Sequence, residues 1–214
     1  ALMIGDLNAA ENHFSQAISI DPTNGKYHLH LAQVYLGRRQ FDKTRMHLLQ
    51  ALNLDSSLPE AYSGMSDLYA RQNKISLALQ QIEKAIDRTP ESDRGDWVIY
   101  MRKKANLLRR DNKPDQALRI LEALLPSERI HPDVMNEVAL CFALMGKPQQ
   151  AAKLYNQALI VLPMDVALLQ GAVIWNHKAN NMEVAQRHLR SMRKIDPNLP
   201  TISKLEKLFV TADH

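Results

Sequence analysis

Apolar residues recur along the chain at the spacing of amphipathic helices and are interrupted by short polar stretches. After Gly25, a first apolar stripe consists of Leu31, Ala32 and Tyr35, and polar residues 37–40 then break it. A second stripe follows, made of Phe41, Thr44, Leu48, Ala51 and Leu52. Spacings of three and four place such residues on one face of a helix. The segment therefore predicts two consecutive helices joined by a tight turn.

The two-helix pattern repeats with a period of 34 residues. Ala17, Ala51 and Ala85 are 34 residues apart, and so are Pro163 and Pro197. Small residues at one point of each pattern are expected where paired helices come close together. The period predicts a partial unit at 1–24, full units at 25–58, 59–97, 98–131, 132–165 and 166–199, and a capping helix with a tail at 200–214.

One unit breaks the period, because the third full unit starts 39 residues after the second. The five extra residues are 93–97, and they are expected to lengthen the following helix by about one turn. The last segment carries Ile202, Leu205, Leu208 and Phe209 on one face, which predicts a helix that covers the end of the array. The first unit lacks a comparable cap and the chain starts at Ala1 without Met, which suggests a fragment of a longer protein.

Composition supports a helical protein. Glycine, the commonest turn residue, occurs only 7 times. The single cysteine, Cys141, excludes an intrachain disulfide and a multi-cysteine metal site, and its apolar neighbours predict a buried thiol. No apolar run is long enough for a membrane-spanning helix. The formal net charge of +4 is weak evidence for a nucleic-acid partner. The compartment stays open between cytoplasm and periplasm.

These residues resemble the tetratricopeptide repeat (TPR) family, whose 34-residue pattern is matched most clearly at 5–22, 62–90 and 146–163. The resemblance implies an all-α, right-handed α-solenoid of antiparallel helix pairs. Lys104 stands where the family usually has leucine, and Asn176 is polar at a point that is aromatic or apolar in the other units. Asn176 is therefore expected either to be hydrogen-bonded or to lie near the groove.

No catalytic constellation emerges from the sequence. The eight histidines include no pair at the spacing of a helical metal site, and no glycine-rich phosphate loop or nucleophilic serine motif occurs. We therefore expect no enzyme activity, no catalytic residue, no metal, no cofactor and no small-molecule substrate.

The resemblance also implies a binding surface, because the first helix of each pair lines the concave side in this family. In the unit from Pro59 these positions hold Glu60, Ser63, Gly64, Asp67, Ala70 and Arg71. The predicted partner-binding residues are His30, Gln33, Arg102, Lys103, Asn106, Arg109, Arg110, Asn136, Leu140, Leu144, Gln170, Ile174 and Lys178.

The unit from Val98 has the most distinctive chemistry, because Arg102, Asn106 and Arg109 form one stripe. Like charges at this spacing mildly destabilise a helix, so a partner with acidic groups would relieve them. Leu140, Leu144 and Ile174 would add an apolar stretch to the same groove.

The sequence thus predicts a non-catalytic scaffold that holds a partner protein or peptide in its groove, one with acidic and apolar residues. Two alternatives remain. The first is nucleic-acid binding along the basic stripe between Arg102 and Lys113, which lacks the aromatic residues that usually accompany it. The second is that the chain is the scaffold arm of a larger bacterial envelope, secretion or polysaccharide-export protein. Direct insertion into a membrane is not expected.

Overall fold

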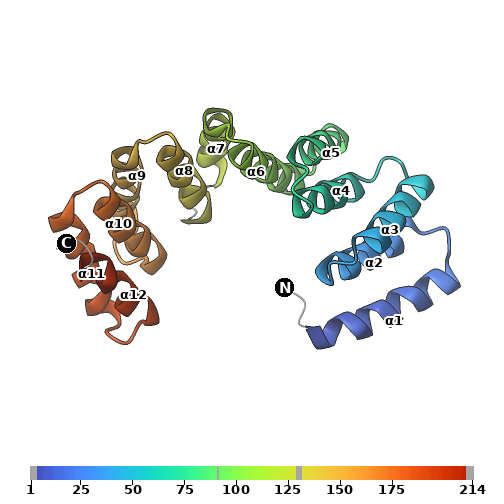
Figure 1. Cartoon of the computed structure of the whole chain (residues 1–214), viewed down its shortest axis with the longest axis horizontal. Helices are drawn as coiled ribbons and strands as arrows, with labels where there is room; N and C mark the ends of the chain where they lie inside the picture. The colour runs from blue at the N-terminus through green and yellow to red at the C-terminus, as the bar shows by residue number, and fades with distance from the viewer. Residues whose placement is uncertain (1–3, 91, 129–131, 211–214) are drawn as a thin grey trace. The chain divides into compact units, whose positions relative to one another are not determined.

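The computed structural model describes residues 4–90, 92–128 and 132–210, and the regular secondary structure of this part is α-helical throughout (Figure 1). The all-α fold predicted from the sequence is confirmed. The helices are α1 (Ile4–Ile20), α2 (Gly25–Gly37), α3 (Phe41–Leu54), α4 (Pro59–Arg71), α5 (Ile75–Arg88), α6 (Arg94–Arg110), α7 (Pro114–Glu128), α8 (Pro132–Leu144), α9 (Pro148–Val161), α10 (Val166–Lys178), α11 (Met182–Ile195) and α12 (Pro200–Val210).

The chain forms two compact units, residues 1–112 and 113–214. In unit 1, α2 packs against α3 and α4 packs against α5, while α3 also contacts α4 and α5 contacts α6. Consecutive helices therefore pair and then stack, which is the arrangement of an α-solenoid.

Small residues allow the helices of unit 1 to approach one another. Ala51, Ala61, Ala78 and Ala85 are completely buried. Larger apolar residues, including Leu48, Leu68 and Ile82, fill the space around these contacts and are also buried. The amphipathic stripes of the sequence thus become the core of the unit, and the completely buried alanines leave room for its helices to pack.

The turns inside the helix pairs share one backbone feature. Arg39, Asn73, Asn112 and Asn180 have φ between 57° and 62°, and Gly146 has φ of 70°. Each of these residues follows the first helix of a pair. Asparagine and glycine tolerate the left-handed region better than other residues, so the sequence at four of the five turns suits the conformation that ends the helix.

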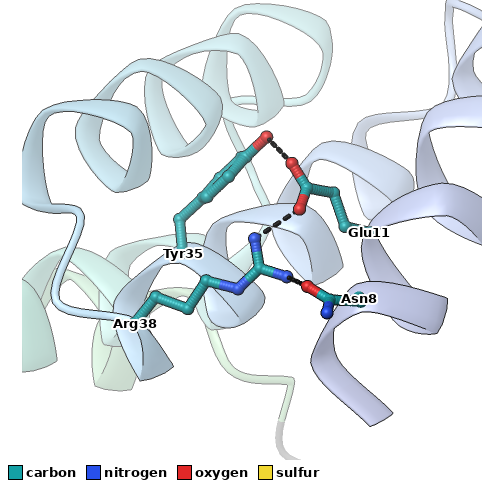
Figure 2. Close-up of polar contacts among 4 residues, drawn as sticks. All are labelled: Asn8, Glu11, Tyr35 and Arg38. Carbon is teal, nitrogen blue, oxygen red and sulfur yellow. Dashed lines mark hydrogen bonds and ion pairs between the residues drawn. The ribbon is translucent and has the colours of Figure 1, made fainter. Parts of the chain in front are cut away.

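Helix α1 is held on α2 by a carboxylate with two donors (Figure 2). The Tyr35 hydroxyl donates a hydrogen bond of 2.7 Å to Oε1 of Glu11, and the Arg38 guanidinium pairs with Oε2. Arg38 also reaches the side-chain oxygen of Asn8. The hydrogen bonds from Tyr35 and Arg38 lower the pKa of Glu11, because they favour its charged form.

The five extra residues before the third full unit lengthen the next helix as expected. Helix α6 has 17 residues, whereas α4 has 13. Asp93 caps its start by accepting a hydrogen bond from the backbone N–H of Asp96. Lys104, which occupies the family's usual leucine position, extends to α5 and pairs with Glu83 at 2.9 Å.

In unit 2, α10 lies at the centre and contacts α8, α9, α11 and α12. Its residues Leu168, Ala172 and Val173 are completely buried. Helix α12 covers α10 and α11 with Ile202 and Leu205, which belong to the same apolar core. Cys141 is buried, as the sequence predicted.

A buried polar network crosses the core of unit 2. Asn176 is completely buried, and its amide donates to Oδ1 of Asn156 at 2.9 Å and to the Ala172 carbonyl at 2.8 Å. His188 Nε2 lies 3.0 Å from the same Asn156 oxygen. The polar departure at Asn176 is therefore hydrogen-bonded, and it joins α9, α10 and α11.

The network predicts acid-sensitive stability. Burial, with a smaller contribution from the Arg187 charge, holds the pKa of His188 below its ordinary value of 6.5. Below that pH the unfolded chain binds a proton that the folded chain binds less readily, so the free energy of unfolding falls as the pH drops. We expect His188→Gln to lose less stability than wild type between about pH 7.5 and about pH 5.5, measured by urea unfolding.

The matched control is His13→Gln, because His13 is exposed on α1. It should show the wild-type pH dependence. An unchanged pH dependence in His188→Gln would contradict the assignment of this acid sensitivity to the network.

Candidate functional site

Three first helices of unit 1 line an open cavity of about 190 Å³, called here the unit-1 cavity. Helices α2, α4 and α6 supply most of its lining, and α3 supplies Thr44 and Leu48. The lining residues are Ala32, Gln33, Leu36, Thr44, Leu48, Glu60, Ser63, Gly64, Asp67, Tyr100 and Lys103. Gln33 and Lys103, both predicted as binding residues, are thus brought together with four predicted groove positions of the unit from Pro59.

The absence of a side chain at Gly64 of α4 exposes Leu48 to this cavity. A Cβ at Gly64 would lie 2.8 Å from Cδ2 of Leu48, which is closer than such atoms normally approach. The bare backbone at Gly64 lets Leu48 of α3 lie directly beneath the α4 surface. The cavity therefore combines polar groups from the first helices with an apolar base from a second helix.

Charged groups in the cavity are paired across two helices. The Lys103 ammonium of α6 donates to Oδ2 of Asp67 at 2.7 Å and to the Ser63 hydroxyl at 2.8 Å, both on α4. Two turns further along α6, the Arg110 guanidinium donates to the Ala70 carbonyl of α4 at 2.8 Å. Lys103 and Arg110 thus both extend from α6 to α4.

The Arg110 contact borders a second cavity of about 650 Å³ in the same unit. Its lining residues are Leu36, Arg39, Phe41, Asp67, Ala70, Arg71 and Arg110. Asp67 and Leu36 belong to both cavities, so the two form neighbouring parts of one surface made by α2, α4 and α6.

The predicted stripe of Arg102, Asn106 and Arg109 lies elsewhere on α6. Lys103 and Arg110 are seven residues apart and share a face, whereas Arg102 and Arg109 are each one residue earlier, about 100° around the helix. All three stripe residues are half-buried and line neither cavity. His30 of α2 is also half-buried and stacks on Phe14 of α1.

Unit 2 has a cavity of the same construction, with a volume of about 220 Å³. It brings together the predicted residues Asn136, Gln170 and Ile174 from α8 and α10. The full lining is Asp133, Asn136, Tyr155, Ala167, Gln170, Gly171 and Ile174. Burial and the Asp133 carboxylate raise the pKa of Tyr155 to about 12, so its hydroxyl stays protonated.

The remaining predicted residues of unit 2 lie outside this cavity. Leu140 is half-buried and packs against the apolar core, whereas Leu144 is exposed. Lys178 is exposed, and its ammonium lies 4.5 Å from the centre of the Trp175 ring. Leu140 and Lys178 thus contact neighbouring side chains of their own unit.

The sequence did not predict the cavity-lining residues that come from the second helices of the pairs. Leu48 and Tyr155 belong to second helices, and only the glycines above them, Gly64 and Gly171, signal their access. It also missed a histidine pair, His28 and His47, whose Nδ1 atoms lie 3.0 Å apart across α2 and α3. The two residues are 19 positions apart, so no local spacing reveals them.

Within 4–90, 92–128 and 132–210, no group of three or more His, Cys, Asp and Glu side chains is placed to hold a metal ion. Over the same ranges, no helix combines the length and apolar character that crossing a bilayer requires.

Comparisons with known proteins agree on the architecture. Residues 102–165 match a family model described as "Tetratricopeptide repeat". Tetratricopeptide repeat protein 21A of Mus musculus is 24% identical over 156 residues, which cover 72% of this chain and 12% of the relative. The chain thus spans only a small part of that relative's length.

Two solved structures show the same fold at low sequence identity. PilW, described as a widely conserved type IV pilus biogenesis factor, has a TM-score of 0.75 and 17% identity, over 94% of this chain and 91% of PilW. YrrB, described as a TPR protein with an unusual peptide-binding site, has a TM-score of 0.60 and 20% identity, over 91% and 97%.

The glycine contacts predict unequal effects of adding one methyl group. A Cβ at Gly171 would lie 2.1 Å from Cε1 of the buried Tyr155 ring. Gly171→Ala should therefore destabilise unit 2 by about 1–3 kcal/mol despite the better helix propensity of alanine, as overpacking does. Thermal and urea unfolding measure the change.

Gly64→Ala is the comparison. It meets only the end of the Leu48 side chain, which can rotate away, so its stability should stay within about 1 kcal/mol of wild type. Equal effects of the two substitutions, or a more stable Gly171→Ala, would show that Tyr155 does not occupy the space described.

Proposed function

Because the chain is a tetratricopeptide repeat protein, we propose that it is a non-catalytic scaffold that binds a segment of a partner protein along the surface formed by its first helices. The single observation that carries this proposal is the unit-1 cavity. There, three successive first helices bring hydrogen-bonding, charged and apolar side chains to one recess. Such a mixture suits an extended segment whose side chains enter separate pockets.

The comparisons support this class of function without identifying the partner. YrrB is described as having a peptide-binding site, and PilW as a pilus biogenesis factor. PilW gives a reason to keep the alternative that this chain is an arm of a bacterial envelope assembly. An arm of this kind would also need a face that holds its partner, so the same surface would serve in both cases.

The structure gives less support to nucleic-acid binding. Two of the basic residues on α6 are engaged within the protein, since Lys103 pairs with Asp67 and Arg110 bonds the Ala70 carbonyl. A phosphate backbone is bound by cations that are free to neutralise it. An acidic partner segment for the face that carries Arg102 and Arg109 stays a prediction.

Affinity capture with matched variants tests the proposal. Gln33→Arg changes the unit-1 cavity, and Gln50→Arg makes the same change on α3, where Gln50 is also exposed and lies outside the cavity lining. We expect a protein captured from native extract by wild type to be lost with Gln33→Arg, because the larger cation obstructs the surface, and kept with Gln50→Arg.

Nuclease treatment and circular dichroism complete the design. Capture should survive nuclease, and all variants should retain wild-type helical content. A partner bound equally by Gln33→Arg and Gln50→Arg would place binding elsewhere in unit 1, and loss of capture after nuclease would favour the nucleic-acid alternative.

A further inference from the structure

One carboxylate oxygen in the unit-1 cavity has no hydrogen-bond partner among the residues that the structure describes. Oε2 of Glu60 is buried and makes no hydrogen bond with the described residues, although Glu60 lines the cavity. Burying a carboxylate oxygen without a donor costs free energy, which a donor from a binding partner would offset. The cavity thus offers an acceptor that the folded chain leaves unused.

The other charged groups of the cavity make a cation the better match for this acceptor. Lys103 is already paired with Asp67 at 2.7 Å and with Ser63 at 2.8 Å. The lining therefore carries two carboxylates and one ammonium. An anionic group would face this excess of negative charge, and an uncharged apolar group would leave the Glu60 oxygen unpaired.

Further carboxylates add to the negative potential beside Tyr100. Burial raises the pKa of Tyr100, and the charges of Glu60, Asp96 and Asp93 raise it further. Burial and the charges of Asp93 and Glu60 likewise raise the pKa of Asp96. Because Glu60, Asp96 and Asp93 all raise the pKa of Tyr100, their fields add beside this cavity wall. The Tyr100 ring in the wall is also compatible with a cation nearby.

The dimensions and walls fit one long side chain. At about 190 Å³, the cavity is smaller than the roughly 300–1,000 Å³ typical of sites for small-molecule ligands. Ala32, Leu36 and Leu48 supply apolar wall that can contact an aliphatic stem. Lysine and arginine combine such a stem with a charged donor group at its end.

We propose that the unit-1 cavity binds a lysine or arginine side chain of the partner segment, whose charged end donates a hydrogen bond to Glu60. This inference rests on the proposed function and specifies the chemistry of its partner. It differs from the acidic partner predicted for Arg102 and Arg109, because those residues lie on another face of α6.

Short capped peptides test the inference without knowledge of the partner. Acetyl-Gly-Lys-Gly-amide and its arginine counterpart carry the proposed side chains, and the norleucine counterpart has the stem without the charge. Methyl NMR spectra report binding through Leu36 and Leu48. We expect saturable shifts of these methyl signals with the lysine or the arginine peptide, and much weaker binding of the norleucine peptide.

Glu60→Gln identifies the acceptor, since it keeps the size of the side chain and removes its charge. It should weaken peptide binding about tenfold or more, as expected for a hydrogen bond to a charged group. Glu122→Gln makes the same change at an exposed position of α7 in unit 2 and should bind as wild type does. Methyl spectra of both variants without peptide check that unit 1 remains folded.

The possible failures of this inference and of the proposed function can be told apart. The inference is overturned if neither basic peptide binds, if the norleucine peptide binds equally well, or if Glu60→Gln binds like wild type. Partner capture that still depends on Gln33 would then leave the scaffold function standing. Capture that is insensitive to Gln33→Arg would count against the scaffold surface whatever the peptides do.

Discussion

Close approach of paired helices is the constraint on which the rest of the structure depends. Ala51, Ala78 and Ala85 in unit 1, and Ala151 and Ala185 in unit 2, are completely buried. Any larger side chain at these points would separate two backbones and disturb the packing of the next pair. Each helix pair needs its small residues at the same position of the unit. Small residues therefore recur in the sequence with the 34-residue period of the units.

The two small cavities are an extension of the same packing rule. Where the first helix has glycine, at Gly64 and Gly171, a side chain of a neighbouring second helix lies directly under its backbone. Leu48 and Tyr155 thereby become part of the surface cavities while remaining buried. Glycine weakens a helix by about 1 kcal/mol relative to alanine, so these contacts give the two glycines a structural reason.

The sequence predicted the fold well because helical periodicity depends on local spacing, and local spacing is visible in one chain. It predicted the site only in part. Gln33 and Lys103 meet in one cavity, but Arg102 and Arg109, favoured for their chemistry, lie on another face of the same helix. The five inserted residues, 93–97, form the N-cap and first turn of α6 and leave the rotation of this helix undefined in the sequence. Pairing between Lys103 and Asp67, 36 residues apart, depends on that rotation.

Net charge is a poor guide to what such a surface recognises. The whole chain carries +4, which favours acidic partners at long range. Recognition depends instead on the few groups that lose water on binding. In the lining of the unit-1 cavity, the Lys103 ammonium is paired with Asp67, and Oε2 of Glu60 is buried without a hydrogen-bond partner among the described residues. A partner bound by this cavity would therefore be basic, whereas the net charge of the chain favours an acidic one. The difference arises because the positive charge of the cavity is already paired within the protein.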